Sequence, residues 1–183
     1  MAKVPYISRN DMHPSKQNIY DKISSSRGAV QNVFSALLNN PEATQAVTNL
    51  GEYIRYKSTL HPRIREIAIL VTAKKLKNSY EWSQHEPVAK SVGVSNEVIE
   101  YILDENNQNK IDAKESIFIE SAKELVTSSR LKQKTFDSLM KSLGMQSTID
   151  FIVTVGYYTM LDKIISTLDV DFDKWMTENQ KFN

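Results

Sequence analysis

The stretch that decides the fold runs from Arg63 to Val92 and reads RIREIAILVTAKKLKNSYEWSQHEPVAKSV. Its first half is apolar at helical spacing and also at most positions in between, which indicates a helix that is buried on several sides. Asn78 or Ser79 is a suitable N-cap for a second helix, and Gly93 is a suitable glycine to end it. The stretch therefore predicts an antiparallel pair of helices at the centre of the fold.

Helical spacing continues on both sides of this pair. Pro41 follows a good N-cap at Asn40, and Gly144 closes a helix that begins near Lys132. The other predicted helices cover residues 14–26, 30–38, 41–57, 96–103, 112–128, 132–143 and 145–167, with a polar surface loop at 104–110. With only five glycines, the chain lacks the tight turns that a sheet-rich fold needs. The sequence therefore predicts an all-α, single-domain helical bundle.

The chain divides into three predicted parts. Residues 1–26 form an N-terminal arm and a first helix, which ends before the break at Arg27-Gly28. Residues 27–170 form the helical domain. Residues 171–183 form a C-terminal tail, because the apolar periodicity stops near Asp169.

A weak internal repeat links two segments of the chain. VAKSVGV at 88–94 resembles LMKSLGM at 139–145, and each is a helix followed by a glycine stop. The residues of the second copy that align with Glu66, Glu81 and His85 are Ile117, Lys132 and Phe136. If the helix pair is repeated, the second copy keeps the helix–glycine–helix scaffold but lacks the polar site formed by Glu66, Glu81 and His85.

Composition excludes several classes of function. The 23 basic and 22 acidic side chains leave a net charge of +1, which gives no bulk electrostatic reason to bind nucleic acid or an anionic membrane. No stretch approaches the roughly 20 apolar residues of a membrane helix, and residues 1–12 lack the apolar core of a signal peptide. We therefore expect a cytoplasmic protein that binds neither nucleic acid nor a membrane. Cysteine is absent, which rules out disulfides, thiolate metal sites and cysteine nucleophiles.

Three polar residues are candidates for chemistry. Glu81 and His85 are four residues apart, so they lie on one helical face within contact reach. His85 also lies on the apolar stripe that contains Trp82 and Ala89, so its ring should point inward. Glu66 comes from the preceding antiparallel helix and can face the same spot. A buried imidazole that a carboxylate orients is a plausible acid–base pair.

The residues that follow His85 bear on the backbone and on metals. Pro87 costs about 3 kcal/mol in a helix interior, so we expect a kink just after His85 or a restart of the helix at Glu86-Pro87. His85-Glu86 resembles half of a zinc motif, but Ala89 stands where the second histidine would be needed. The sequence therefore predicts no metal site.

The spacing of these residues resembles that of a known family. Glu66 is followed by eleven residues, Asn78, two residues, Glu81, three residues and His85. The carboxymuconolactone decarboxylase and alkylhydroperoxidase D-like superfamily is similar: its redox members carry Glu, eleven residues, Cys-x-x-Cys, three residues and His. Asn78 and Glu81 therefore stand at the two cysteine positions. The entry segment from Arg27 and the segment at 156–161 extend the resemblance to about residues 27–170.

The resemblance implies a function without thiols. Thiol peroxidase activity is not expected, because it needs a thiolate nucleophile and a resolving thiol. The cysteine-less pattern implies a cofactor-free lyase of the carboxymuconolactone decarboxylase type, which acts on a small carboxylated lactone or enol acid. His85 would be the acid–base, assisted by Glu81 and Glu66. The expected substrate-binding residues are Asn78, Trp82, Tyr157 and Tyr158. The resemblance also implies a homo-oligomer, a dimer, trimer or hexamer.

Alternative interpretations remain open for the same residues. An inward histidine beside a glutamate is often a satisfied structural pair, and Trp82 is equally suited to the core. Tyr157 and Tyr158 are adjacent and face different directions, so only one of them is expected to reach a pocket. The chain would then be a non-catalytic oligomeric scaffold or ligand-binding module. A His85 ring packed dry against core side chains would favour that alternative.

Overall fold

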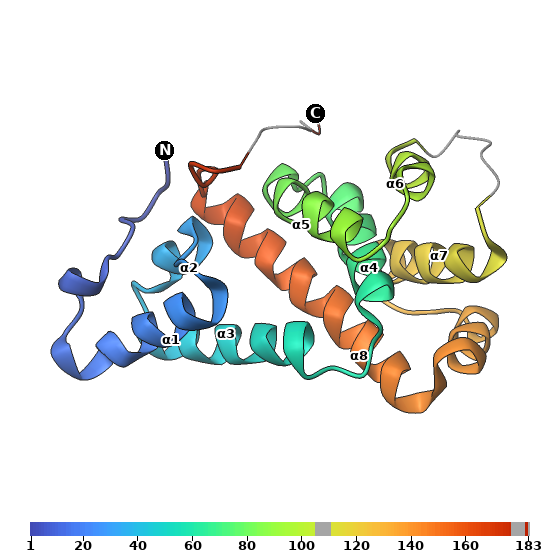
Figure 1. The fold of residues 1–183 in the computed structure, drawn as a ribbon, viewed down its shortest axis with the longest axis horizontal. Coiled ribbons are helices and arrows are strands. Elements are labelled where there is room, and N and C mark those ends of the chain that lie inside the picture. The colour runs from blue at the N-terminus through green and yellow to red at the C-terminus, as the bar shows by residue number, and fades with distance from the viewer. Residues whose placement is uncertain (105–110, 177–181, 183) are drawn as a thin grey trace. The chain divides into compact units, whose positions relative to one another are not determined.

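The computed structural model describes residues 1–104, 111–176 and 182, and regular structure in these ranges is entirely helical. The elements are η1 (Arg9–Asp11), η2 (Pro14–Lys16), α1 (Gln17–Arg27), α2 (Asn32–Leu37), α3 (Pro41–Tyr56), α4 (Pro62–Lys75), α5 (Ser79–Ser91), α6 (Asn96–Leu103), α7 (Ala113–Ser128) and α8 (Gln133–Leu168), as Figure 1 shows. The predicted all-α class is confirmed. Most of the loop predicted at 104–110 lies outside the described residues.

Side-chain caps set many of the helix starts. The side chains of Asn40, Asn78, Ser95 and Asp112 each accept a hydrogen bond from a backbone N–H in the first turn of the helix that follows. Such a cap contributes about 1 kcal/mol because it satisfies a donor that has no partner within the helix. The starts of α3, α5, α6 and α7 are therefore fixed by local sequence, as predicted.

The breaks predicted from glycine and the break predicted from proline have different outcomes. Gly144 has φ 74° and ψ 173°, which interrupts α8 and separates the two predicted helices 132–143 and 145–167. Gly93 likewise has a positive φ of 88° directly after α5. The predicted restart at Glu86-Pro87 is wrong, because α5 is one helix from Ser79 to Ser91 with Pro87 inside it. The burial of α5 against its neighbours outweighs the lost proline hydrogen bond.

The chain forms two compact units. Among the described residues, the first consists of Met1–Lys57 and Lys163–Met176, and the second of those within Ser58–Asp162 together with Phe182. In the first unit the two distant segments are joined by polar contacts: the Lys3 N–H donates to the Leu168 carbonyl at 2.8 Å, and the Tyr6 hydroxyl donates to Asp171 at 2.9 Å. The boundaries of the predicted arm, domain and tail remain a prediction.

The second unit is built around α4. Every residue of α4 from Glu66 to Ala73 is buried, and the helix packs against both α5 and α7. Figure 1 shows α4 and α5 side by side, which is the antiparallel pair expected from the sequence. The largest fully buried side chains around them include Trp82 and Phe151. Burial of such side chains stabilises the unit by about 25 cal/mol per Å² of apolar surface.

Candidate acid–base site

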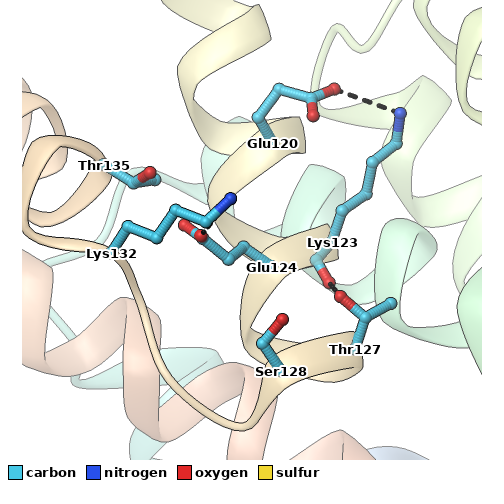
Figure 2. A pocket seen from close by; sticks show the side chains of 7 residues that line it. All are labelled: Glu120, Lys123, Glu124, Thr127, Ser128, Lys132 and Thr135. Carbon is cyan, nitrogen blue, oxygen red and sulfur yellow. Dashed lines mark hydrogen bonds and ion pairs between the residues drawn. The ribbon is translucent and has the colours of Figure 1, made fainter.

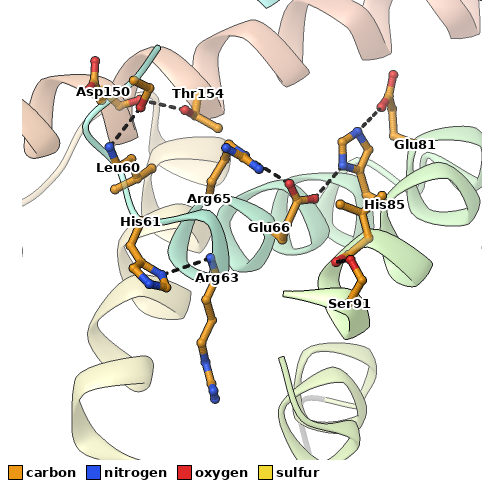
Figure 3. A network of polar contacts seen from close by, with 12 residues as sticks. Leu60, His61, Arg63, Arg65, Glu66, Glu81, His85, Ser91, Asp150 and Thr154 are labelled. Carbon is orange, nitrogen blue, oxygen red and sulfur yellow. Dashed lines mark hydrogen bonds and ion pairs between the residues drawn. The ribbon is translucent and has the colours of Figure 1, made fainter. Parts of the chain in front are cut away.

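The structure brings the three predicted chemical residues together inside the second unit. Nδ1 of His85 lies 2.7 Å from Oε2 of Glu66, which comes from α4. Nε2 of the same ring lies 3.6 Å from Oε2 of Glu81, one turn earlier on α5. Figure 3 shows the imidazole between the two carboxylates, with Arg65 on the far side of Glu66. The two ring nitrogens thus face two different acids.

Local structure explains this arrangement. Glu81 and His85 occupy positions i and i+4 of α5, so their side chains project from one face. The side chain of Asn78 accepts the Glu81 N–H at 2.9 Å and so fixes the first turn of α5. Glu66 reaches the ring because α4 and α5 pack along their length.

The site is buried and charged. Glu66, His85 and Glu81 are 1%, 3% and 4% exposed, and Nε of Arg65 lies 3.1 Å from Oε1 of Glu66. Burial by itself raises the pKa of the Glu66 carboxyl. The charge and hydrogen bond of His85, together with those of Arg65, outweigh burial and hold the pKa of Glu66 below its ordinary value.

An ionised Glu66 fixes the chemistry of the ring. A carboxylate only accepts hydrogen bonds, so Nδ1 of His85 must carry the hydrogen of the short contact to Glu66. Nε2 is therefore the ring atom that can gain or lose a proton, and it faces Glu81. The arrangement is that of an oriented general acid–base beside a second acid.

The predicted substrate-binding residues differ in their relation to the ring. Tyr158 packs its ring edge-on against His85, with ring centroids 4.9 Å apart, whereas Tyr157 packs edge-on against Tyr158 at 5.3 Å. Trp82 is fully buried, and its indole N–H donates to Glu86 at 2.9 Å. Asn78 is buried in the first turn of α5. Their part in binding a substrate remains a prediction.

Sequence reasoning missed one buried acid beside the site. Asp162 of α8 is buried and accepts a hydrogen bond from Nδ2 of Asn78 at 3.0 Å. The two residues are 84 positions apart in the sequence, so no local spacing connects them. The available signal was an aspartate placed between Leu161 and Ile165, two apolar residues that are buried in the same helix.

Two surface hollows have linings that do not include Glu66, Glu81 or His85. Figure 2 shows one of about 290 Å³ between α7 and the start of α8. It is lined by Glu120, Lys123, Glu124, Thr127, Ser128, Lys132 and Thr135. A second, of about 340 Å³, is lined by His61, Arg63, Ile64, Ile67, Asp112, Lys114, Glu115 and Phe118. Neither includes Glu66, Glu81 or His85, so neither is an entrance to the acid–base site.

Two further features concern only the described ranges, 1–104, 111–176 and 182. In them, no three His, Asp or Glu side chains are grouped closely enough to hold a metal ion. No helix in those ranges is both long and apolar enough to cross a membrane.

Comparison with known proteins relates this geometry to a family. Residues 41–105, which contain Glu66, Asn78, Glu81 and His85, match the Carboxymuconolactone decarboxylase family. Solved structures share the fold over nearly the whole chain. The family match covers residues 41–105, and the likeness of fold to alkylhydroperoxidase D-like structures extends over nearly the whole chain. No match is found among curated proteins.

Three solved structures illustrate this likeness of fold. A variant of the debrominase Bmp8 in complex with 2,3,4-tribromopyrrole has 15% identity and a TM-score of 0.77, covering 95% of this chain and 93% of that chain. An uncharacterized peroxidase-related protein from Silicibacter sp. TM1040 has 17% identity and a TM-score of 0.77, covering 97% and 93%. An alkylhydroperoxidase AhpD core protein from Ralstonia eutropha JMP134 has 12% identity and a TM-score of 0.71, covering 99% and 98%. At these identities the likeness establishes the fold alone.

Proposed function

We propose that this cysteine-less chain is a cofactor-free acid–base enzyme, a lyase of the carboxymuconolactone decarboxylase type. The observation that carries the proposal is the imidazole of His85 held between Glu66 and Glu81. Glu66 fixes the ring at 2.7 Å through Nδ1, and Nε2 is left facing a second carboxylate at 3.6 Å. Positioned proton transfer of this kind accelerates reactions by about 10²–10⁴-fold.

The proposed reaction uses each acid differently. Glu66 stays ionised and holds the ring, because its pKa lies below the ordinary value. His85 delivers a proton from Nε2 to the substrate carbon that loses carbon dioxide, and Glu81 passes one proton from solvent back to Nε2 between turnovers, so each turnover consumes one proton. In a decarboxylation the bond to the carboxylate carbon breaks, carbon dioxide leaves, and the electron pair moves into a conjugated carbonyl of the substrate. The substrate supplies its own electron sink, so the residues act without a cofactor.

The proposed substrate is a small carboxylated lactone or enol acid. Glu66, Glu81 and His85 are all buried within one chain, so a substrate that reaches them should be small. The debrominase Bmp8, which shares the fold, has been seen in complex with 2,3,4-tribromopyrrole, which is also a small flat ring. We assign substrate contact to Asn78, Trp82, Tyr157 and Tyr158, among which Tyr158 already lies against the His85 ring.

A second candidate is a non-catalytic scaffold or ligand-binding module that keeps the fold. The close burial of the His85 ring, with carboxylates on both nitrogens and Tyr158 on its edge, is the specific observation that favours it. Buried charged groups of this kind are often paired for structural reasons alone. The expected homo-oligomer and cytoplasmic location fit either candidate and remain proposals.

A ligand screen separates the two candidates. Thermal unfolding of the wild type, His85→Ala and His13→Ala would be followed with small lactones, keto acids and dicarboxylates. His13 is exposed and lies in the other unit, so His13→Ala is the matched control. If the protein is an enzyme, one compound should raise the Tm of the wild type and of the control but not the Tm of His85→Ala. The wild type should then convert that compound to a product. Absence of a shift and of turnover in all three proteins would favour the scaffold.

A further inference from the structure

Asp162 lies at the end of a short chain of contacts that leads to the acid–base site. It is buried in α8, and its Oδ1 accepts from Nδ2 of Asn78 at 3.0 Å. The same Asn78 side chain accepts the Glu81 N–H through Oδ1 at 2.9 Å. One amide therefore connects a carboxylate of α8 to the turn that carries Glu81.

The chemistry of the two partners allows only one orientation of this amide. An ionised carboxylate accepts hydrogen bonds and cannot donate, so it must face the NH₂ group of Asn78. The backbone N–H of Glu81 only donates, so it must face the amide oxygen. A flipped amide would set its oxygen against the Asp162 oxygen and its NH₂ group against the Glu81 N–H, and neither contact would be a hydrogen bond. Asp162 thus selects the rotamer of Asn78 that caps α5.

The same face of α8 also contacts the imidazole. Tyr158 and Asp162 are four residues apart in one helix, so they project side by side. Tyr158 packs against the ring of His85, and Asp162 fixes the turn that holds Glu81. One helix face therefore contacts both members of the Glu81–His85 pair, directly or through Asn78.

We propose that Asp162 is a positioning residue that acts through Asn78 to place Glu81 opposite Nε2 of His85. Its chemical purpose rests on the function proposed above, whereas its structural effect on the ring does not. Asn78 and Glu81 occupy the two positions at which redox relatives carry thiols. In this chain an amide oriented by Asp162 and a carboxylate take those places.

The test is nuclear magnetic resonance of the histidine rings in the intact chain. Only three histidines are present, and comparison with His85→Gln assigns the signals of His85. In Asp162→Ala we expect the Nε2 nitrogen signal to shift and the Nδ1 signal to stay, because Glu66 still holds Nδ1. Asp162→Asn retains an oxygen acceptor for Asn78, so it should restore the wild-type Nε2 signal. A general loosening of the core would move both nitrogens and would refute the proposal.

Asp150→Ala is the matched control. Asp150 is another buried aspartate of α8, and it accepts from the Thr59 N–H and hydroxyl rather than from Asn78. The variant Asp150→Ala should lower the melting temperature and leave the Nδ1 and Nε2 signals of His85 in place. An Nε2 signal unchanged in Asp162→Ala, or shifted equally in Asp162→Asn, would overturn the positioning role.

A second variant covers the case in which Asp162→Ala does not fold. Asn78→Gly keeps a residue that is tolerated at the N-cap and removes the amide that joins Asp162 to Glu81. It should shift the Nε2 signal while Nδ1 stays, and an unchanged Nε2 signal would again count against the proposal.

A substrate assay runs in parallel: with a substrate in hand, kcat should fall in Asp162→Ala and recover in Asp162→Asn. If the ring signals respond as expected and no turnover is found in the wild type, the proposed function fails while the positioning role stands.

Discussion

Two buried carboxylate clusters of the second unit have opposite chemical character. Asp150 on α8 accepts from the N–H and hydroxyl of Thr59 at 2.7 and 2.8 Å and so ties the segment before α4 to α8. Glu66 on α4 is instead paired with His85 and Arg65, and the ring leads on to Glu81. Thr59 offers only a neutral amide and a neutral hydroxyl, whereas the partner of Glu66 is an imidazole, which is an ionisable group. Both acids are buried, so the kind of partner and not burial distinguishes the two clusters.

The largest expected effect comes from the second of these clusters. Glu66→Ala leaves the His85 ring and the Arg65 guanidinium, which is 11% exposed, without their shared carboxylate. Removing one partner of a buried ion pair costs about 3–5 kcal/mol, because the buried groups that remain lose the charge and the hydrogen bonds of the shared acid. Urea unfolding should show that loss, together with loss of any turnover. A loss below about 1 kcal/mol would mean that the network is solvated rather than closed.

The Asp150 cluster should behave differently. Asp150→Ala leaves the Thr59 N–H and hydroxyl without this acceptor, at a cost of about 1–3 kcal/mol. The folded fraction should keep the full turnover of the wild type, measured well below the lowered Tm. A parallel fall in kcat would erase the distinction between the two clusters.

Acid should weaken the Glu66 cluster in a definite direction. Because the pKa of Glu66 is lower in the folded than in the unfolded chain, the unfolded state binds more protons between the two values, and stability rises with pH there. The stability that the ionised Glu66 contributes is fully present above the ordinary glutamate pKa of about 4.3. It is lost as the pH falls through the lower pKa of Glu66 in the folded chain. Glu66→Gln should flatten this acid limb in chemical unfolding measured from pH 2 to 7. An equally steep limb in Glu66→Gln would assign it to other carboxylates.

The smallest effect is expected at an exposed pair on the same helix as His85. Lys90 contacts Glu86 at 2.7 Å, four residues apart, and its side chain is 49% exposed. Water and salt screen such a pair, so Lys90→Ala should cost about 0.3–0.5 kcal/mol and leave turnover unchanged. The measurement sets the baseline for charge removal on α5. A cost approaching that of Glu66→Ala would show that exposure does not separate the two kinds of pair.

Local sequence predicted much of the fold and part of the site. The caps at Asn40, Asn78, Ser95 and Asp112 and the breaks at Gly93 and Gly144 lie where side-chain chemistry and backbone freedom require them. The proximity of Glu81 and His85 also follows from helical spacing alone. Pro87 was the exception, because a helix buried on several sides tolerates a lost hydrogen bond that an isolated helix would not.

The sequence by itself determined the helices, the inward face that carries His85 and the absence of any thiol. Each depends on residue type or on neighbours within about one helical turn. Only the tertiary structure decided that Glu66 meets Nδ1, that Tyr158 packs against the ring, and that Asp162 meets Asn78 across 84 residues. Those contacts depend on the rotation and register of α4 and α8 against α5. The packing of large buried side chains sets these quantities, and no local spacing encodes them.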